Sequence, residues 1–87
     1  MFLLIITYSF LMNLNMAVAK TIKDLRKQKG VSQEKLADAI DSHQVYISEI
    51  EKGKKIPSLT VLYNIAAFFE MTLTDLIKEI EDKLNNA

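Results

Sequence analysis

Apolar residues recur at intervals of three and four along most of the chain, which is the period of amphipathic helices. Val18, Ile22 and Leu25 begin the pattern, and Gly30 follows them where a left-handed residue would end a helix. The same period continues to the C-terminus. Outside the N-terminal segment, no stretch shows the alternation of apolar and polar residues that is typical of a half-buried strand. The pattern therefore predicts an all-α fold with five helices, the first of them starting near Val18.

Capping residues set the expected bounds of the later helices. A Ser or Thr hydroxyl accepts hydrogen bonds from the free N–H groups that begin a helix, and glycine often follows its end. The predicted helices run from Gln33 to about Ile40 after the cap Ser32, from Gln44 to Gly53, onward from Ser58, and onward from Thr72 with Asp75 completing a capping box. The residues expected to face inward on the second to fourth helices are Leu36, Ala37, Ile40, Ile47, Ile50, Leu59, Leu62, Ile65, Ala66 and Phe69. The fifth helix carries the apolar residues Leu73, Leu76, Ile77, Ile80 and Leu84.

The connection between the second and third helices is very short. Only Asp41, Ser42 and His43 separate them, which is room for a tight turn and nothing longer. Aspartate tolerates a positive φ at such a turn better than most non-glycine residues do. Ala37, one helical turn earlier, is small enough to let the third helix approach closely. Two short helices joined in this way predict a helix-turn-helix unit.

The third helix has two different faces. At 100° per residue, Ile47 and Ile50 lie on one side, while Gln44, Val45 and Ser48 lie on the other. The outward face is polar apart from Val45, which points most directly away from the isoleucines. The sequence therefore predicts a helix that is anchored on one side and presents a polar face with one apolar residue on the other.

The first fifteen residues carry no charge and stand apart from this pattern. A bilayer requires about 20 apolar residues, so the segment is too short to span one. Two interpretations stay open: residues 1–15 form a poorly ordered or partly buried arm, or translation starts at Met12 or Met16, just before a domain at residues 16–87. A secretory signal is disfavoured because no Lys or Arg precedes the apolar run, and because cleavage after Ala19 would remove part of the first helix.

Composition and charge narrow the class of protein. The chain of 87 residues has room for one small core, and it contains no cysteine, which excludes disulfides and thiolate metal sites and suits the reducing cytoplasm. His43 is the only histidine, so a histidine metal cluster or a nucleophile–histidine pair has no second member. We therefore expect no enzyme, no cofactor, no metal, no membrane insertion and no small-molecule ligand.

The formal net charge is zero, but the two halves of the chain differ. Nine basic and six acidic residues give residues 20–55 a charge of +3, whereas two basic and five acidic residues give residues 56–87 a charge of −3. A basic half joined to an acidic half favours a polyanion as the partner of the basic half.

Three segments carry a resemblance to a known family. IKDLRKQKGVSQEKLADAI, ISEIEKGKKIPSL and LTDLI occur in the order and spacing of Cro- and lambda-repressor-like (Xre-type) helix-turn-helix domains, which the chain resembles over about residues 18–77. Within that family, QKGVSQEKLAD and YISEIEKG are most similar to the controller proteins of restriction–modification systems. The departures are Asp41 and Glu70 where the family usually has glycine, His43 where Ser or Thr commonly caps, Gln44 where controllers often have arginine, and Phe68 where a small residue is usual.

The resemblance implies how the domain would meet DNA. In this family the third helix enters the major groove and the second crosses the backbone. The base-reading positions are then Gln44, Val45, Tyr46 and Ser48. A glutamine can make a bidentate contact with adenine and a valine can pack on a thymine methyl group. Tyr46 has the alternative role of supporting the core, and Glu49 is expected to be solvated because phosphates repel a carboxylate.

A second group of residues is expected at the phosphates. Gln33 opens the second helix, whose positive N-terminal end attracts an anion. The proposed phosphate-binding residues are Gln33, His43, Lys52, Lys54, Lys55 and Arg26. The resemblance also implies that Arg26 forms a structural ion pair with Glu51, and His43 is expected to lie near the backbone as a turn or cap residue.

The last two helices carry more apolar residues than one small core needs. The surplus residues Val61, Phe68, Ile80 and Leu84 are the expected homodimer interface, with the N-terminal arm as a competing cover for this surface. The sequence thus predicts a dimeric transcription regulator that binds double-stranded DNA at a palindromic operator. The alternative is a protein-interaction module, antitoxin-like or an adaptor, whose fourth and fifth helices hold a protein partner.

Overall fold

Five helices make up the part of the chain that the computed structural model describes, namely the backbone of residues 2–85 and the side chains of residues 14–85. They are α1 (Phe2–Gln28), α2 (Gln33–Ala39), α3 (Gln44–Glu51), α4 (Leu59–Phe68) and α5 (Leu73–Asn85). Residues 2–85 contain no strand, so the prediction of an all-α fold is confirmed.

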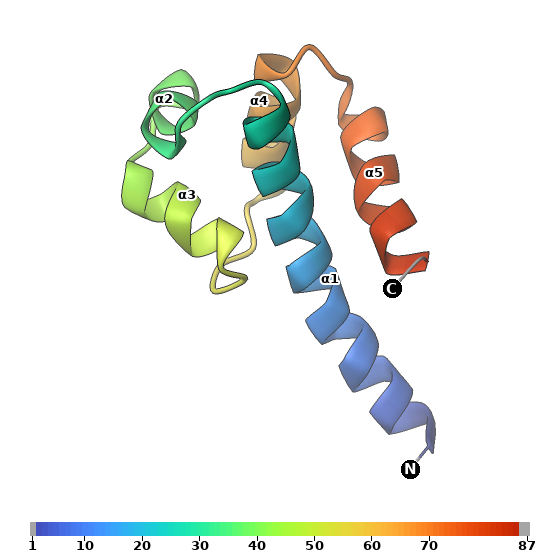
Figure 1. The fold of residues 1–87 in the computed structure, drawn as a ribbon. Coiled ribbons are helices and arrows are strands. Elements are labelled where there is room, and N and C mark those ends of the chain that lie inside the picture. The colour runs from blue at the N-terminus through green and yellow to red at the C-terminus, as the bar shows by residue number, and fades with distance from the viewer. Residues whose placement is uncertain (1, 86–87) are drawn as a thin grey trace.

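The C-terminal half of α1 runs through the middle of the body (Figure 1). It packs against α5, which runs antiparallel to it, and against α3. The short helices α2 and α3 pack on each other, and α4 packs on α5. The helix-turn-helix unit and α5 therefore lie on opposite sides of α1, while the N-terminal half of α1 extends beyond the other helices (Figure 1).

The start of the first helix was predicted wrongly. We expected it near Val18, after an arm at residues 1–15, but α1 begins at Phe2. The physical reason is that no glycine or proline occurs before Gly30, so nothing in the sequence ends a helix in this stretch. Whether the arm is partly buried concerns side chains that lie outside those described. The predicted end is confirmed, because α1 ends at Gln28 and Gly30, two residues later, has φ +65°.

The core is built from all five helices. Its buried members are Ala17, Val18, Ile22, Leu25, Leu36, Ala37, Ile47, Ile50, Leu62, Ile65, Ala66, Phe69, Leu76 and Ile80. Ile40, Leu73, Ile77 and Leu84 are half-buried against this cluster, so most of the predicted inward faces are confirmed.

Within the described residues no single helix is long and apolar enough to cross a membrane; α4 and α5 reach that length and hydropathy only as a pair, and the pair is bent by 102°.

Leu59 is the exception among the predicted core residues. Its side chain is 66% exposed. It is the first residue of α4, so it shares an angular position with the buried residues of that helix but lies at the end of the helix. The helical period gives the direction of a side chain and contains no information about where the neighbouring helices stop, which is why the sequence assigned Leu59 to the core.

The predicted caps are present. The hydroxyl oxygen of Ser32 accepts a hydrogen bond from the backbone N–H of Lys35 at 3.0 Å. The corresponding hydrogen bonds at the starts of α4 and α5 join Ser58 to Val61 N–H at 3.1 Å and Thr72 to Asp75 N–H at 3.0 Å. Each bond satisfies one backbone donor that would otherwise have no partner within its helix.

Within residues 2–85, two non-glycine residues adopt positive φ angles. Asp41 has φ 55°, as the short connection between the second and third helices suggested, and Glu70 has φ 59° after α4. The left-handed region brings the Cβ atom close to the following carbonyl oxygen and costs an L-residue roughly 1–2 kcal/mol. Aspartate is better suited to this region than glutamate, so Glu70 is the more strained of the two.

The substitution Glu70→Gly should therefore stabilise the protein by about 0.5–1 kcal/mol. The relief of the left-handed strain exceeds the roughly 0.4–1 kcal/mol by which glycine favours the unfolded chain. The measurement is the midpoint of urea denaturation. Ala67→Gly, at an exposed position inside α4, is the matched control and should destabilise by about 1 kcal/mol. Equal signs for the two variants would contradict the strain at Glu70.

Candidate nucleic-acid interface

The turn between α2 and α3 sets the relative position of the two short helices. After Ala39, the backbone N–H of Ser42 donates to the carbonyl of Ala37 at 2.8 Å, and the positive φ of Asp41 reverses the chain. Ala37 is only 1% exposed. Its small side chain allows the close packing of α2 on α3 that the sequence suggested. The result is a helix-turn-helix unit whose second helix lies at the surface (Figure 1).

The two faces of α3 lie as the helical period predicted. Ile47 and Ile50 are fully buried in the core. Val45 is 65% exposed on the opposite face, beside the exposed Gln44 and the half-buried Ser48. The buried isoleucines hold the helix on the body, and the outward residues are free to contact a macromolecule in front of it.

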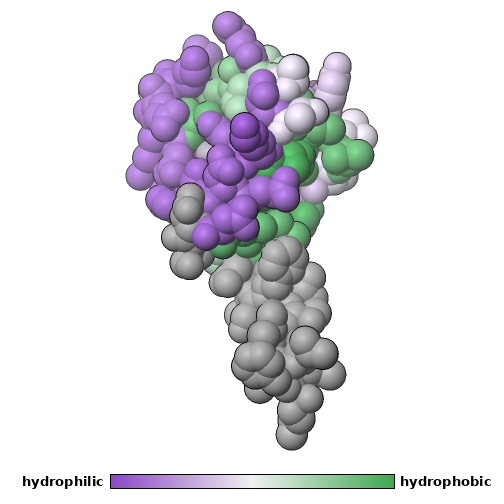
Figure 2. All heavy atoms as spheres, turned by 90° about the vertical axis from the view of Figure 1, so that its right-hand side faces the viewer, coloured by the Kyte–Doolittle hydropathy of each residue, from purple (hydrophilic) through white to green (hydrophobic). Residues whose placement is uncertain are grey.

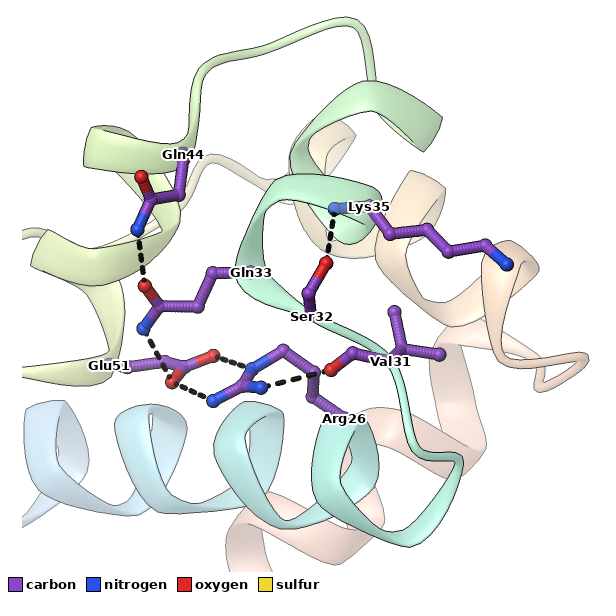
Figure 3. Close-up of polar contacts among 7 residues, drawn as sticks. All are labelled: Arg26, Val31, Ser32, Gln33, Lys35, Gln44 and Glu51. Atoms are coloured by element: carbon purple, nitrogen blue, oxygen red, sulfur yellow. Dashed lines mark hydrogen bonds and ion pairs between the residues drawn. The ribbon is translucent and has the colours of Figure 1, made fainter.

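Four side chains from three helices form a continuous polar chain (Figure 3). The amide nitrogen of Gln44 donates to the amide oxygen of Gln33 at 3.0 Å, and the amide nitrogen of Gln33 donates to Oε1 of Glu51 at 3.1 Å. Gln33 and Gln44 are the first residues of α2 and α3, and Glu51 is the last residue of α3. The chain therefore connects the exposed N-terminal end of α3 to its buried end.

Arg26 of α1 closes this polar chain at the buried end. Its Nε and Nη2 atoms donate to the two carboxylate oxygens of Glu51 at 2.7 and 3.0 Å, and Nη1 donates to the carbonyl of Val31 at 2.9 Å. The side chains of Arg26 and Glu51 are 14% and 4% exposed. The hydrogen bonds to Glu51 raise the pKa of Arg26, while burial acts in the opposite direction. The pair therefore fixes α1 to α3 through charge-assisted, bidentate hydrogen bonds.

The contacts of both glutamines were missing from the sequence-based picture. They join residues that are 11 and 18 positions apart, on different helices. No local spacing rule brings such residues together, because their distance depends on how α2 and α3 pack. The only signal in the sequence is that both glutamines occupy the first position of a helix, at the edge of the helix-turn-helix unit.

A second set of contacts joins α3 to the loop that follows it. Lys55 Nζ lies 3.7 Å from Oε1 of Glu49 and 6.0 Å from the centre of the Tyr46 ring. Glu49 was expected to be solvated; its side chain is 33% exposed, and it forms its ion pair with Lys55 across the turn at Gly53. Tyr46 is half-buried against the core, which is the supporting role that the sequence had left open.

The remaining cationic positions are exposed. Lys52 and Lys54 flank Gly53, whose φ is +74° and whose missing Cβ would lie 2.9 Å from the sulfur of Met16. His43 occupies the N-cap position of α3, but its side chain makes no capping hydrogen bond. The predicted location of His43 is thus correct, and its hydrogen-bonding capacity remains available to a ligand at the same end of α3 as Gln44.

The residues predicted to form the dimer interface do not all lie at the surface of the single chain. Ile80 is only 3% exposed within a single chain, so its assignment to a surface between two copies is wrong. The reason is that it lies on the face of α5 that also carries the buried Leu76. Val61, Phe68 and Leu84 are half-buried and pack against the core. The exposed apolar residues nearest to them in the sequence are Ile56, Leu59 and Tyr63.

No cluster of three metal-ligating residues is found among the side chains of residues 14–85.

A shallow groove lies along α5, lined by Leu73, Thr74, Ile77, Lys78 and Glu81. Figure 2 views the molecule from the α5 side and shows hydrophobic surface next to a hydrophilic area on the body.

The chain belongs to the HTH_3 helix-turn-helix family, which matches residues 22–76. The match covers α2, α3 and α4 entirely, together with the C-terminal end of α1 and the first turn of α5. It therefore includes both the polar chain from Arg26 to Gln44 and the outward face of α3.

Several relatives of known class resemble the chain. It is 44% identical over 61 residues to the control protein C.MunI from Mycoplasma sp, which covers 69% of this chain and 82% of the relative. It is 29% identical over 66 residues to the HTH-type transcriptional regulator DdrOP3 from Deinococcus deserti, covering 76% of this chain and 51% of that relative. The chain thus spans about half the length of DdrOP3.

The fold also matches solved structures. The restriction–modification controller protein C.Esp1396I, in a structure of its tetramer with its natural 35-base-pair operator, superposes with a TM-score of 0.73 and 27% identity. The match covers 82% of this chain and 93% of that chain. The resemblance to lambda-repressor-like regulators and to controller proteins is therefore confirmed in both sequence and structure.

Proposed function

We propose that the chain is a sequence-specific transcription regulator that binds double-stranded DNA as a homodimer. The observation that carries the proposal is the exposed face of α3, where Gln44 and Val45 stand out from a helix whose other face is fully buried. Membership of the helix-turn-helix family and the operator complex of the similar C.Esp1396I support it. Neither feature calls for catalysis or a cofactor.

In the proposed complex, α3 lies in the major groove and presents Gln44, Val45 and Ser48 to the base edges. Tyr46 is half-buried, so only its hydroxyl group is a candidate for DNA contact. The start of α2 meets the phosphate backbone, where Gln33 and the free N–H groups of the helix can bind an anion. These assignments separate the residues that specify a sequence from those that hold the DNA.

The proposed phosphate contacts come from exposed residues after α3. Lys52 and Lys54 have no intramolecular ion pair in the described part of the chain, whereas Lys55 is already held by Glu49. His43 adds a donor at the opposite end of the helix. Arg26 makes three hydrogen bonds inside the protein, so its role in the proposal is to hold α3 in place, with any phosphate contact secondary.

The proposed dimer places two copies of α3 in successive major grooves, about 34 Å apart, which matches a palindromic site. We assign its contact surface to α4 and α5, where Leu59 and Tyr63 are exposed and where Val61, Phe68 and Leu84 are half-buried. The hydrophobic surface seen beside α5 supports this choice (Figure 2). Residues 1–15 remain a second candidate for the same contact.

Selection of bound duplexes from a random oligonucleotide pool tests the proposal. A palindromic sequence should be enriched at moderate salt, and one duplex should bind two chains in sedimentation. If no sequence is enriched while α4 and α5 retain a protein partner, the alternative of a protein-interaction module is correct. The selected duplex then serves for the measurements on variants.

Val45→Ser should weaken discrimination at one thymine by about 1 kcal/mol or less, because it removes the apolar contact to the methyl group. The dependence of binding on salt should stay unchanged, since no phosphate contact is lost. Fluorescence anisotropy with duplexes altered at single positions provides the measurement.

Lys54→Ala is the matched control for Val45→Ser. It should weaken binding to all sequences to a similar degree and reduce the salt slope by about one unit. A large drop in the melting temperature of Val45→Ser would contradict the exposure of Val45 and with it the proposed reading face.

A further inference from the structure

The orientation of the Gln44 amide group determines which purine it can recognise. A glutamine amide has a donor on one side and an acceptor on the other, and a half-turn exchanges them. In the major groove, adenine presents the acceptor N7 and the donor N6, whereas guanine presents the acceptors N7 and O6. An amide that offers one N–H and its oxygen therefore complements adenine, and an amide that offers two N–H groups complements guanine.

Glu51 determines the orientation of the first amide in the polar chain. Its carboxylate in the ion pair with Arg26 can only accept hydrogen bonds. Gln33 must therefore turn its amide nitrogen towards Glu51, as it does at 3.1 Å (Figure 3). The side chain of Glu51 is only 4% exposed, so the carboxylate has little freedom to turn away towards water.

The orientation of Gln33 then determines that of Gln44. Because the nitrogen of Gln33 is directed at Glu51, its oxygen faces Gln44, and that oxygen can only accept. Gln44 accordingly donates one N–H to it, at 3.0 Å. The groups of Gln44 that remain for a ligand are its second N–H and its oxygen, which is the pair that adenine requires.

We propose that Glu51 is a positioning residue for base recognition, and that it acts through Gln33 to hold the Gln44 amide in the orientation that selects adenine over guanine. The inference rests on the proposed function, which places Gln44 in the major groove. A buried charge near the end of α3 thus determines the specificity of an exposed side chain at its beginning, without touching the DNA.

The substitution Glu51→Gln allows the whole chain of donors and acceptors to reverse. Oε1 of Glu51 accepts from both Arg26 Nη2 and Gln33, whereas Oε2 accepts from Arg26 Nε. In the orientation that leaves the new amide oxygen on Arg26 Nε, the new amide nitrogen would face Gln33. Gln33 would then accept with its oxygen and donate with its nitrogen to the oxygen of Gln44. Gln44 would offer two N–H groups to the DNA. The ratio of affinities for adenine and guanine at the contacted position should fall by about tenfold or more.

Gln33→Lys tests the same step and keeps the ion pair of Arg26 with Glu51 intact. The lysine ammonium group can only donate, so it would bind Glu51 and the oxygen of Gln44 together, again leaving two N–H groups on Gln44. Gln33→Met is the matched control, because it has no strong donor or acceptor. It should reduce the preference for adenine without creating one for guanine.

The experiment measures binding of each variant to the selected duplex and to duplexes that carry each purine at the position identified by Gln44→Ala. The ratio for the two purines cancels any general loss of affinity. Suppose that Gln44→Ala does affect one position, but that the adenine-to-guanine affinity ratio there is unchanged in both Glu51→Gln and Gln33→Lys. This result overturns the inference about Glu51 and leaves the proposed function intact. If Gln44→Ala affects no position, the proposed reading face itself is wrong. If Glu51→Gln does not fold, Gln33→Lys decides the question.

Discussion

Replacing Arg26 by methionine should lower the free energy of unfolding by about 3 kcal/mol or more. The substitution leaves the Glu51 carboxylate, which is 4% exposed, with Gln33 as its only remaining side-chain donor among residues 14–85. A buried charge that loses its partner typically costs roughly 3–5 kcal/mol. Methionine retains much of the length of arginine, so loss of packing is a small part of the effect. Urea denaturation followed by circular dichroism measures the change.

The pair itself is measured by a double-mutant cycle with Glu51→Leu. Replacing both residues by apolar ones removes the unpaired charge, so the double variant should lose about 1–3 kcal/mol less than the sum of the two single variants. Arg26 would keep its hydrogen bond to Val31 in the Glu51→Leu variant, so this single substitution should cost less than Arg26→Met. Strictly additive losses would show that the two residues are not coupled.

The stability from this pair should not vary with pH near neutrality. The hydrogen bonds to Glu51 raise the pKa of Arg26 above its ordinary, strongly basic value, so the contribution of the pair is complete below that ordinary value and is lost only as the pH rises through the folded-state pKa. The coupling energy should therefore be the same at about pH 6 and about pH 9. A coupling that disappeared in this range would indicate that another titrating group holds Glu51.

Ile80→Ala is the second substitution with a large expected effect, and it should cost about 2–5 kcal/mol of stability. The side chain is 3% exposed in a single chain and belongs to the core cluster, so its truncation leaves a cavity between α5 and the body. Because the burial lies within one chain, the loss should be the same at low and high protein concentration. If the loss of stability depended on protein concentration, Ile80 would instead lie in the interface between two copies.

Leu59→Ala provides the matched control on α4. Leu59 is 66% exposed, and substitutions at such positions usually change stability by less than about 0.5 kcal/mol in the monomer. Its effect should appear instead in self-association, as a shift of sedimentation towards monomer. The two substitutions thus separate the core from the proposed contact surface, which the apolar pattern alone had merged.

The comparison of Ile80 with Leu59 shows where the sequence-based prediction reached its limit. Both residues occupy apolar positions on amphipathic helices, and the sequence assigned Leu59 to the core and Ile80 to the dimer interface. Burial also requires a neighbouring helix at that height along the axis. Residues 76 and 80 of α5 have one, whereas the first residue of α4 has none. The start of α1 was missed for a related reason, because no residue before Gly30 marks a helix boundary.

The sequence by itself determined the five-helix pattern, the caps at Ser32, Ser58 and Thr72, and the two faces of α3. These features depend on residues within a few positions of one another, so backbone geometry and helical period suffice to infer them. The sequence also pointed to the family and to the outward position of Gln44 and Val45.

Only the tertiary structure decided how the polar groups are connected. The chain from Arg26 through Glu51 and Gln33 to Gln44 joins residues on three helices, and its distances follow from the packing of α1, α2 and α3. The orientation of each amide depends on what its neighbour can donate or accept, and such neighbours are set by the fold and not by separation along the chain. For that reason the sequence located Gln44, while the structure alone showed which of its hydrogen-bonding groups remain free.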